Sequence, residues 1–141
     1  MAINFFEEDI SFKLPEKNPH KKWLKSLAET EGFIIRELNY IFCSDEYLHQ
    51  MNVDYLNHNT YTDIITFDNS EKEKDIEGDI FISIPRVKEN ALNQNIDFLT
   101  ELRIVLAHGI LHLMGYRDKT ESEIKEMRNK EAFSISLFAI K

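Results

Sequence analysis

The run HGILHLMGYRD, residues 108–118, constrains the fold of this chain more than any other segment. His108 and His112 are four residues apart, so on a helix they project from one face with their side chains about 5–6 Å apart. Gly115 can end that helix in a left-handed conformation and turn the chain back. Asp118 can then approach the same point. The spacing predicts a helix with three polar side chains gathered at its C-terminal end.

These three side chains form a candidate metal site. Two imidazoles and a carboxylate can ligate a divalent cation, and three protein ligands leave positions open for water, as in catalytic rather than structural sites. The alternative is a helix that merely carries two histidines. The other histidines have no such spacing and are predicted to be surface or hydrogen-bonded residues: His20, His49 and His58.

A divalent cation at this site favours hydrolysis, because it lowers the pKa of coordinated water and polarises carbonyl or phosphoryl oxygens. The spacing resembles the metzincin protease signature HExxHxxGxxH, with Asp118 at the third-ligand position. Those proteases need a glutamate directly after the first histidine as general base, and this chain has Gly109 there. A metzincin-like metalloprotease is therefore a minor alternative.

The rest of the chain predicts a single α+β domain, residues 1–141, with a small mixed four-stranded sheet covered by about five helices. At 141 residues, with 43% apolar residues and only three prolines, the chain can bury a core without disulfides. Strands are predicted at residues 2–7, 33–43, 62–67 and 79–84, with a polar hairpin loop at 68–75. Helices are predicted at 17–31, from 44–45 through 55, at 85–94, from 97 through the two histidines, and from 120 through 137.

Local signals define several helix ends and faces. Gly32 ends the first helix and Pro85 suits the first turn of the third. Asp97 can cap the histidine-bearing helix, and Thr120 and Glu123 form a capping box for the last one. That last helix is expected to bury its apolar residues, which are Ile124, Met127, Ala132, Phe133, Ile135 and Leu137.

Three observations indicate a cytoplasmic protein. The single cysteine, Cys43, lies in an apolar run and is expected to be a buried, inert thiol, which suits a reducing compartment. Residues 1–9 turn acidic without a basic region, unlike a secretory signal. No uncharged apolar stretch approaches 18 residues, so we expect no membrane span and no membrane partner.

The net charge of −8 opposes binding to nucleic acid through a global field, because phosphate binding depends on lysine and arginine. A basic footprint would have to be local. The best candidate is a group of lysines near the first predicted helix, whose alternative interpretation is a solvated helix face: Lys13, Lys17, Lys21, Lys22 and Lys25.

The string HGILHLMGY, residues 108–116, resembles the HGxLHLxGY signature of the bacterial YbeY family of metal-dependent endoribonucleases and rRNA maturation factors. Three other segments agree with family motifs. Residues 51–55, MNVDY, resemble LNxxY/F, residues 62–67, TDIITF, resemble TDVLSF, and residues 78–83, GDIFIS, resemble GDIxI. Motif order and spacing match from about residue 30 to the C-terminus.

This resemblance implies a cytoplasmic enzyme that binds one zinc ion and cuts single-stranded RNA. It implies a role in 16S rRNA 3′-end maturation and in ribosome assembly and quality control, with rRNA and the small subunit or its proteins as partners and no DNA. The implied metal ligands are His108, His112 and Asp118. Asp63, Asp79 and Tyr116 match motif positions and are weak candidates for supporting the site. Each has an equally good structural interpretation, as a turn, cap or packing residue.

Two positions depart from the family pattern. Asp118 stands where the third ligand is usually histidine, and its negative charge makes coordinated water less acidic and favours harder divalent ions than zinc. Leu56 stands where an arginine usually follows the LNxxY/F segment. Such an arginine can grip an RNA phosphate with two hydrogen bonds, and leucine cannot.

Basic residues elsewhere could partly replace that arginine in RNA binding, and the candidates are His58, Arg117 and Lys119. If they do not, the alternative function is a ribosome-assembly binding protein that keeps its metal site but has little catalysis.

Overall fold

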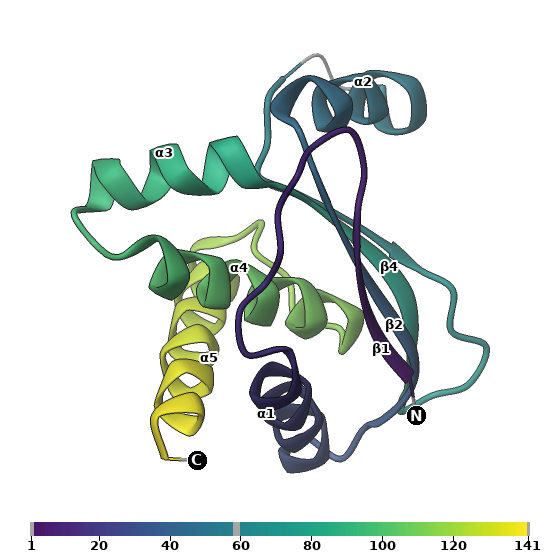
Figure 1. Ribbon diagram of the computed structural model, residues 1–141. Coiled ribbons are helices and arrows are strands. Elements are labelled where there is room, and N and C mark those ends of the chain that lie inside the picture. The colour runs from purple at the N-terminus through teal and green to yellow at the C-terminus, as the bar shows by residue number, and fades with distance from the viewer. Residues whose placement is uncertain (1, 58–59, 141) are drawn as a thin grey trace.

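The computed structural model describes residues 2–57 and 60–140, without the side chains of residues 139 and 140. Within these residues four strands and five helices follow one another, which confirms the predicted α+β class (Figure 1). In chain order they are β1 (Ala2–Glu7), α1 (Lys17–Thr30), β2 (Ile34–Cys43), α2 (Asp45–Leu56), β3 (Ile64–Asp68), β4 (Asp75–Ser83), α3 (Ile84–Gln94), α4 (Phe98–Leu113) and α5 (Glu121–Ile140). His58 lies outside the described residues.

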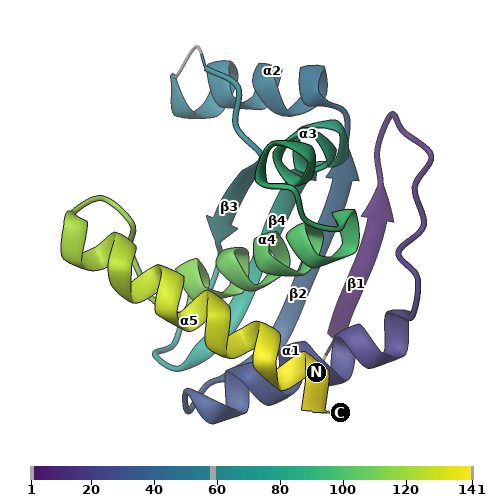
Figure 2. The same cartoon turned by 90° about the vertical axis from the view of Figure 1, so that its left-hand side faces the viewer.

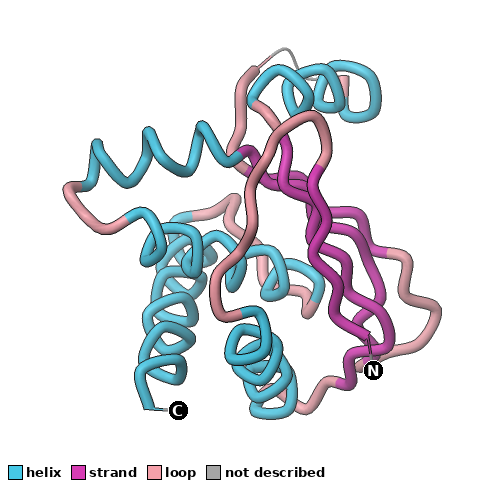
Figure 3. Tube along the Cα trace, in the orientation of Figure 1, coloured by secondary structure: helices cyan, strands magenta, loops and turns pink. Residues whose placement is uncertain are grey.

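The sheet is mixed, with the strand order β1-β2-β4-β3. β1 and β4 both run parallel to β2, whereas β3 forms an antiparallel hairpin with β4. Strands and helices form separate layers (Figure 3). Helix α4 crosses one face of the sheet and α5 lies outside it, farther from the strands (Figure 2). The connection from β1 to β2 contains α1, whereas the connection from β2 to β4 contains α2 and the antiparallel strand β3.

β2 departs from simple alternation because it contains a bulge. Its pairing with β4 shifts between Ile35 and Glu37, which leaves Arg36 without a partner in the register. The shift lets Ile35 and Leu38, three residues apart, both face the core. A strand without a bulge would place Ile35 and Leu38 on opposite faces of the sheet.

β4 begins earlier than predicted, at Asp75 rather than Asp79. Its first residues are polar, but the strand alternates strictly and buries Ile76, Ile80 and Ile82 on the face toward the helices. The hairpin loop is shortened accordingly to residues 69–74.

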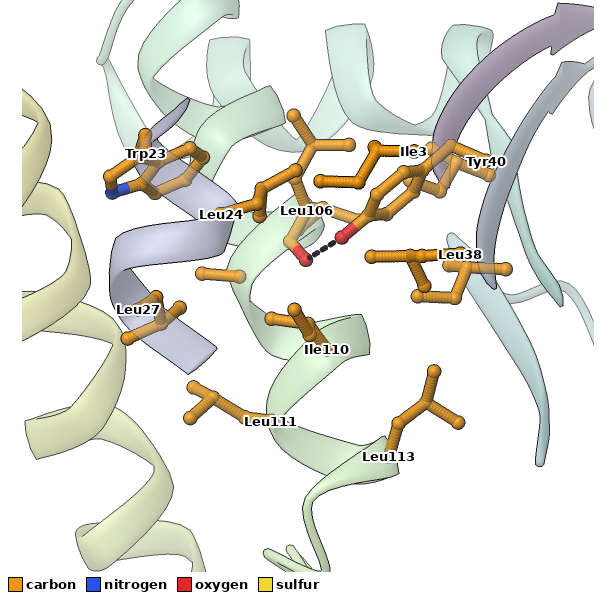
Figure 4. Packing of buried hydrophobic residues seen from close by; sticks show 14 of the residues in the cluster. Ile3, Trp23, Leu24, Leu27, Leu38, Tyr40, Leu106, Ile110, Leu111 and Leu113 are labelled. Atoms are coloured by element: carbon orange, nitrogen blue, oxygen red, sulfur yellow. Dashed lines mark hydrogen bonds between the residues drawn. The ribbon is translucent and has the colours of Figure 1, made fainter. Parts of the chain in front are cut away.

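The main core lies between the sheet and helices α1, α4 and α5 (Figure 4). Tyr40 is buried in it, and its hydroxyl donates a hydrogen bond to the Leu106 carbonyl at 2.8 Å, which ties β2 to α4. Trp23 Nε1 donates to the Ser134 carbonyl at 2.6 Å and ties α1 to α5. Cys43 is buried as expected.

The predicted helix ends are mostly confirmed. Gly32 follows α1, Pro85 lies in the first turn of α3, and Thr120 and Glu123 exchange the two hydrogen bonds of a capping box. Asp97 occupies the N-cap position of α4, but its side chain makes no capping hydrogen bond.

The predicted buried face of α5 is partly wrong. Met127 is buried, but Ile124 and Phe133 are 42% and 41% exposed, and Ala132 is also exposed. The buried stripe instead runs through Met127, Glu131, Ser134 and Phe138, at the spacing of one helix face. Two of its members are polar, so selecting apolar residues alone could not find it. In the described part of the chain no helix has the length and apolar character needed to span a membrane.

Candidate metal centre

Helix α4 lies close to the sheet because Gly109 has no side chain at the contact. A Cβ at this position would lie 2.9 Å from Ile80 Cδ1 and 3.1 Å from Ile64 Cδ1. The neighbouring face of the helix carries His108 and His112, whose side chains remain 18% and 25% exposed. Gly109, the residue after the first histidine, therefore faces the sheet. A metzincin carries its catalytic glutamate at this position, and a glutamate side chain would not fit here.

The turn after α4 returns the chain to the histidines, as predicted. Gly115 has φ 101°, in the region that favours glycine. Its N–H donates to the His112 carbonyl at 3.0 Å, and the Tyr116 N–H donates to the Leu111 carbonyl at 3.1 Å. These are the two bonds of a Schellman motif, which reverses the chain after the helix and brings Asp118 back.

His108, His112 and Asp118 converge on one point. The two Nε2 atoms are 2.9 Å apart, and Asp118 Oδ2 lies 3.4 Å from His108 Nε2 and 3.5 Å from His112 Nε2. No other set of His, Cys, Asp or Glu side chains among the described residues is grouped closely enough to hold an ion. The structure thus brings together the three residues that the sequence singled out.

Each histidine is oriented through its other ring nitrogen. His108 Nδ1 lies 2.6 Å from Glu131 Oε2, and His112 Nδ1 lies 3.0 Å from the Tyr116 carbonyl oxygen. A carboxylate and a carbonyl can only accept, so we assign the protons to both Nδ1 atoms. Both Nε2 atoms then present lone pairs toward Asp118.

The resulting donor set fits a divalent cation. Two imidazole nitrogens and one carboxylate oxygen face one another, an arrangement that a positively charged partner satisfies. Nitrogen and oxygen ligands in this number match catalytic zinc sites, and the hydrogen bonds on Nδ1 are the support that metal-binding histidines commonly have. Burial and the neighbouring His108 lower the pKa of His112 and outweigh Asp118, which raises it. His112 is therefore neutral near pH 7, as a ligand must be.

Glu131 on α5 is the residue of this site that sequence reasoning missed. Its side chain is 5% exposed and accepts from Arg128 Nη1 at 3.0 Å through the oxygen that does not face His108. A buried carboxylate requires a partner. The sequence signal that could have found it is its spacing of four residues from Met127, which places both on one helix face. A glutamate on a buried helix face usually has a function or a counter-charge.

Tyr116 supports the second histidine through its backbone. Its hydroxyl donates to Glu31 Oε1 at 2.6 Å, and Lys130 Nζ donates to Glu31 Oε2 at 2.8 Å. The carbonyl that orients His112 is therefore anchored both to the end of α1 and to α5.

The two candidate aspartates lie in different places. Asp63 lines a cavity of about 230 Å³ together with His108 and Asp118, and accepts a hydrogen bond from Asn90 Nδ2 at 3.3 Å. Asp79 lies on the opposite face of the sheet from Ile80 and α4, because side chains alternate along β4. It accepts from Asn39 Nδ2 at 3.0 Å in an interstrand ladder, and the structure does not bring it to the triad.

The candidate RNA-binding residues that the structure describes lie on the surface of the protein. Arg117 and Lys119 flank Asp118 and are exposed. Leu56, at the end of α2, is 44% exposed. The lysines near α1 are mostly exposed, and their helix packs on the core through Trp23 and Leu27.

The sequence matches the endoribonuclease YbeY family over residues 3–138. It is 58% identical over 136 residues to "Endoribonuclease YbeY" of Cytophaga hutchinsonii, which covers 96% of this chain and 95% of the relative. It is 49% identical over 130 residues to the protein of the same name from Amoebophilus asiaticus, with 92% and 88% coverage. The solution structure of a Thermotoga maritima protein superposes with a TM-score of 0.67 at 27% identity, over 96% of this chain and 88% of that one. By its match over residues 3–138 and its identity to these relatives, the chain belongs to the endoribonuclease YbeY family.

Proposed function

We propose that this chain is a metal-dependent endoribonuclease that cuts single-stranded RNA at the site formed by His108, His112 and Asp118. The observation that carries the proposal is the convergence of two Nε2 atoms and a carboxylate at 2.9–3.5 Å, in a chain whose relatives are named endoribonucleases. A divalent cation held there supplies Lewis-acid polarisation of a phosphoryl oxygen and lowers the pKa of coordinated water.

The chain's own groups hold this site in one geometry. Glu131 keeps the His108 proton on Nδ1, and the Tyr116 carbonyl does the same for His112. Arg128, whose side chain is 71% exposed, lines the cavity beside His108 and Asp118 and can pair with an RNA phosphate from there.

We propose zinc as the bound ion, with another divalent metal as the alternative because the third ligand is aspartate. The carboxylate adds negative charge that three imidazoles would not, so harder ions compete better. We further propose that the protein works in the cytoplasm on 16S rRNA and the small ribosomal subunit. The family match over residues 3–138 supports this assignment.

The deciding experiment measures cleavage of an unstructured, fluorescently labelled RNA by zinc-loaded protein. We expect cleavage by the wild type and loss of cleavage in His112→Ala. His49→Ala is the matched control, because His49 lies on α2 and stacks on Tyr61. Cleavage that survives His112→Ala would refute the mechanism. Binding to small subunits without cleavage under any divalent metal would favour the ribosome-assembly binding protein instead.

A further inference from the structure

A second, larger cavity opens beside the metal centre. It has a volume of about 830 Å³ and lies between α3, α4, α5 and the residue before β3. It shares five lining residues with the smaller cavity that touches His108 and Asp118, and these are Asp63, Glu101, Ile104, Arg128 and Glu131. A ligand in it would therefore lie next to the site of reaction.

The cavity wall contains two carboxyl–amide pairs. Asn90 Nδ2 donates to Asp63 Oδ2 at 3.3 Å, and Gln94 Nε2 donates to Glu101 Oε1 at 3.2 Å. Asn90 and Gln94 are four residues apart on α3, so one face of that helix holds both carboxyl groups. Glu101 itself is 5% exposed. Asp63 and Asn90 are partly buried, whereas Gln94 is exposed, so the two carboxyl groups and Asn90 form the more sheltered part of the polar wall.

The charges on the wall select against a phosphate. Asp63, Glu101 and Glu131 are acidic, and Arg128, which is bonded to Glu131, is the basic residue among those that line the cavity. Burial raises the pKa of both Asp63 and Glu101, because their carboxylates have lost part of their hydration. Such carboxylates gain most from a neutral ligand that donates N–H groups.

Other lining residues suit a flat, apolar ring. Ile104 of α4 and Ala132 and Ile135 of α5 supply apolar surface to the same cavity. Its volume is in the range of pockets that enclose small organic ligands. Single-stranded RNA offers such a ligand, since its unstacked bases combine an apolar face with hydrogen-bonding edges.

We propose that this cavity is a nucleobase subsite, which takes a base with an exocyclic amino group beside the phosphodiester that is cut. The inference rests on the proposed function for its place in the reaction. The amino group donates to the carboxyl groups of Asp63 and Glu101, and the ring packs against Ile104 and Ile135. The phosphates remain outside, near Arg128. Uracil, which has a carbonyl in place of the amino group, is disfavoured.

The direct test is binding of free nucleosides to the wild type, followed by NMR of the side-chain amides of Asn90 and Gln94. We expect cytidine to shift these signals and to bind about tenfold more tightly than uridine, the discrimination that one good pair of hydrogen bonds provides. Ribose 5-phosphate should not shift them. Equal affinities for cytidine and uridine, or no shift with any nucleoside, would overturn the proposal.

A blocking variant adds a second test. Ala132→Trp fills the cavity without removing a hydrogen bond, and we expect it to weaken cytidine binding and raise the KM for RNA about tenfold. Asn129→Trp, exposed on the same helix, is the control and should change neither. Unchanged cytidine binding in a folded Ala132→Trp protein would refute the subsite. Cytidine binding to a wild type that cuts no RNA would uphold the subsite and refute the proposed function.

Discussion

Replacing Glu131 by glutamine tests how far the metal centre depends on α5. The carboxylate accepts the His108 Nδ1 proton at 2.6 Å, and hydrogen bonds to charged groups contribute about 1.5–3 kcal/mol. Glutamine keeps the volume and one acceptor oxygen but has no charge, so about half of that contribution is lost. A loss of about 0.8–1.5 kcal/mol corresponds to roughly fourfold to tenfold weaker metal binding.

The stability of the fold should change much less. Glu131 also pairs with Arg128, but that side chain is 71% exposed, so the pair contributes under about 1 kcal/mol. Metal affinity is measured by competition with a chromophoric chelator, and unfolding by urea titration. Glu126→Gln is the matched control, because Glu126 is exposed on the same helix. Glu131→Gln protein that binds metal within twofold of the wild type would refute this account of how His108 is oriented.

Four further predictions concern the fold and its titrating groups. Gly109→Ala places a methyl group within 3.1 Å of Ile80 and Ile64. Overpacking should cost about 1–3 kcal/mol, which exceeds the gain in helix propensity of about 1 kcal/mol. Urea titration should therefore show a lower free energy of unfolding than in the wild type. A variant more stable than the wild type would contradict the close packing. Tyr40→Phe removes the buried bond to Leu106 and should cost about 1 kcal/mol in the same assay, whereas no change would show that the bond contributes nothing. Burial and the acidic groups Asp9, Asp45 and Glu8 raise the pKa of Cys43 to about 12. An aromatic disulfide reagent at pH 8 should therefore modify this thiol only after the protein is denatured, and rapid reaction of the native protein would contradict this. Burial alone would raise the pKa of Glu31, but hydrogen bonds from Lys130 and Tyr116 lower it overall. The ionised Glu31 therefore stabilises the fold fully above the ordinary carboxyl pKa, and this stabilisation is lost as the pH falls through the lowered pKa. In Glu31→Gln, the free energy of unfolding should fall less steeply as the pH is lowered through the acidic range, and an unchanged slope would refute this.

The metal triad could be predicted from sequence because its geometry is local. His108 and His112 share one helix face, and Gly115 and Asp118 follow within a single turn motif. Positions three to four residues apart on a helix have fixed relations whatever the rest of the fold does. The approximate positions of the strands and the capping of the last helix could be predicted for a similar reason, since their signals are local in the sequence.

The support of the triad could not be predicted in this way, because it depends on contacts between distant segments. Glu131 reaches His108 across 23 positions, and Glu31 reaches Tyr116 across 85. The bulge near Arg36 also depends on pairing with another strand. Asp79 shows the converse, since it matches a family motif as Asp63 does, but strand alternation directs it to the face of the sheet away from α4.

The central claim is that a divalent ion at His108, His112 and Asp118 enables this chain to cut RNA. The most direct measurement compares cleavage of one unstructured RNA by chelator-stripped protein and by the same protein after one equivalent of zinc is restored. We predict no cleavage by the stripped protein and recovery with the ion. Cleavage that is equally fast in the stripped protein would contradict the claim.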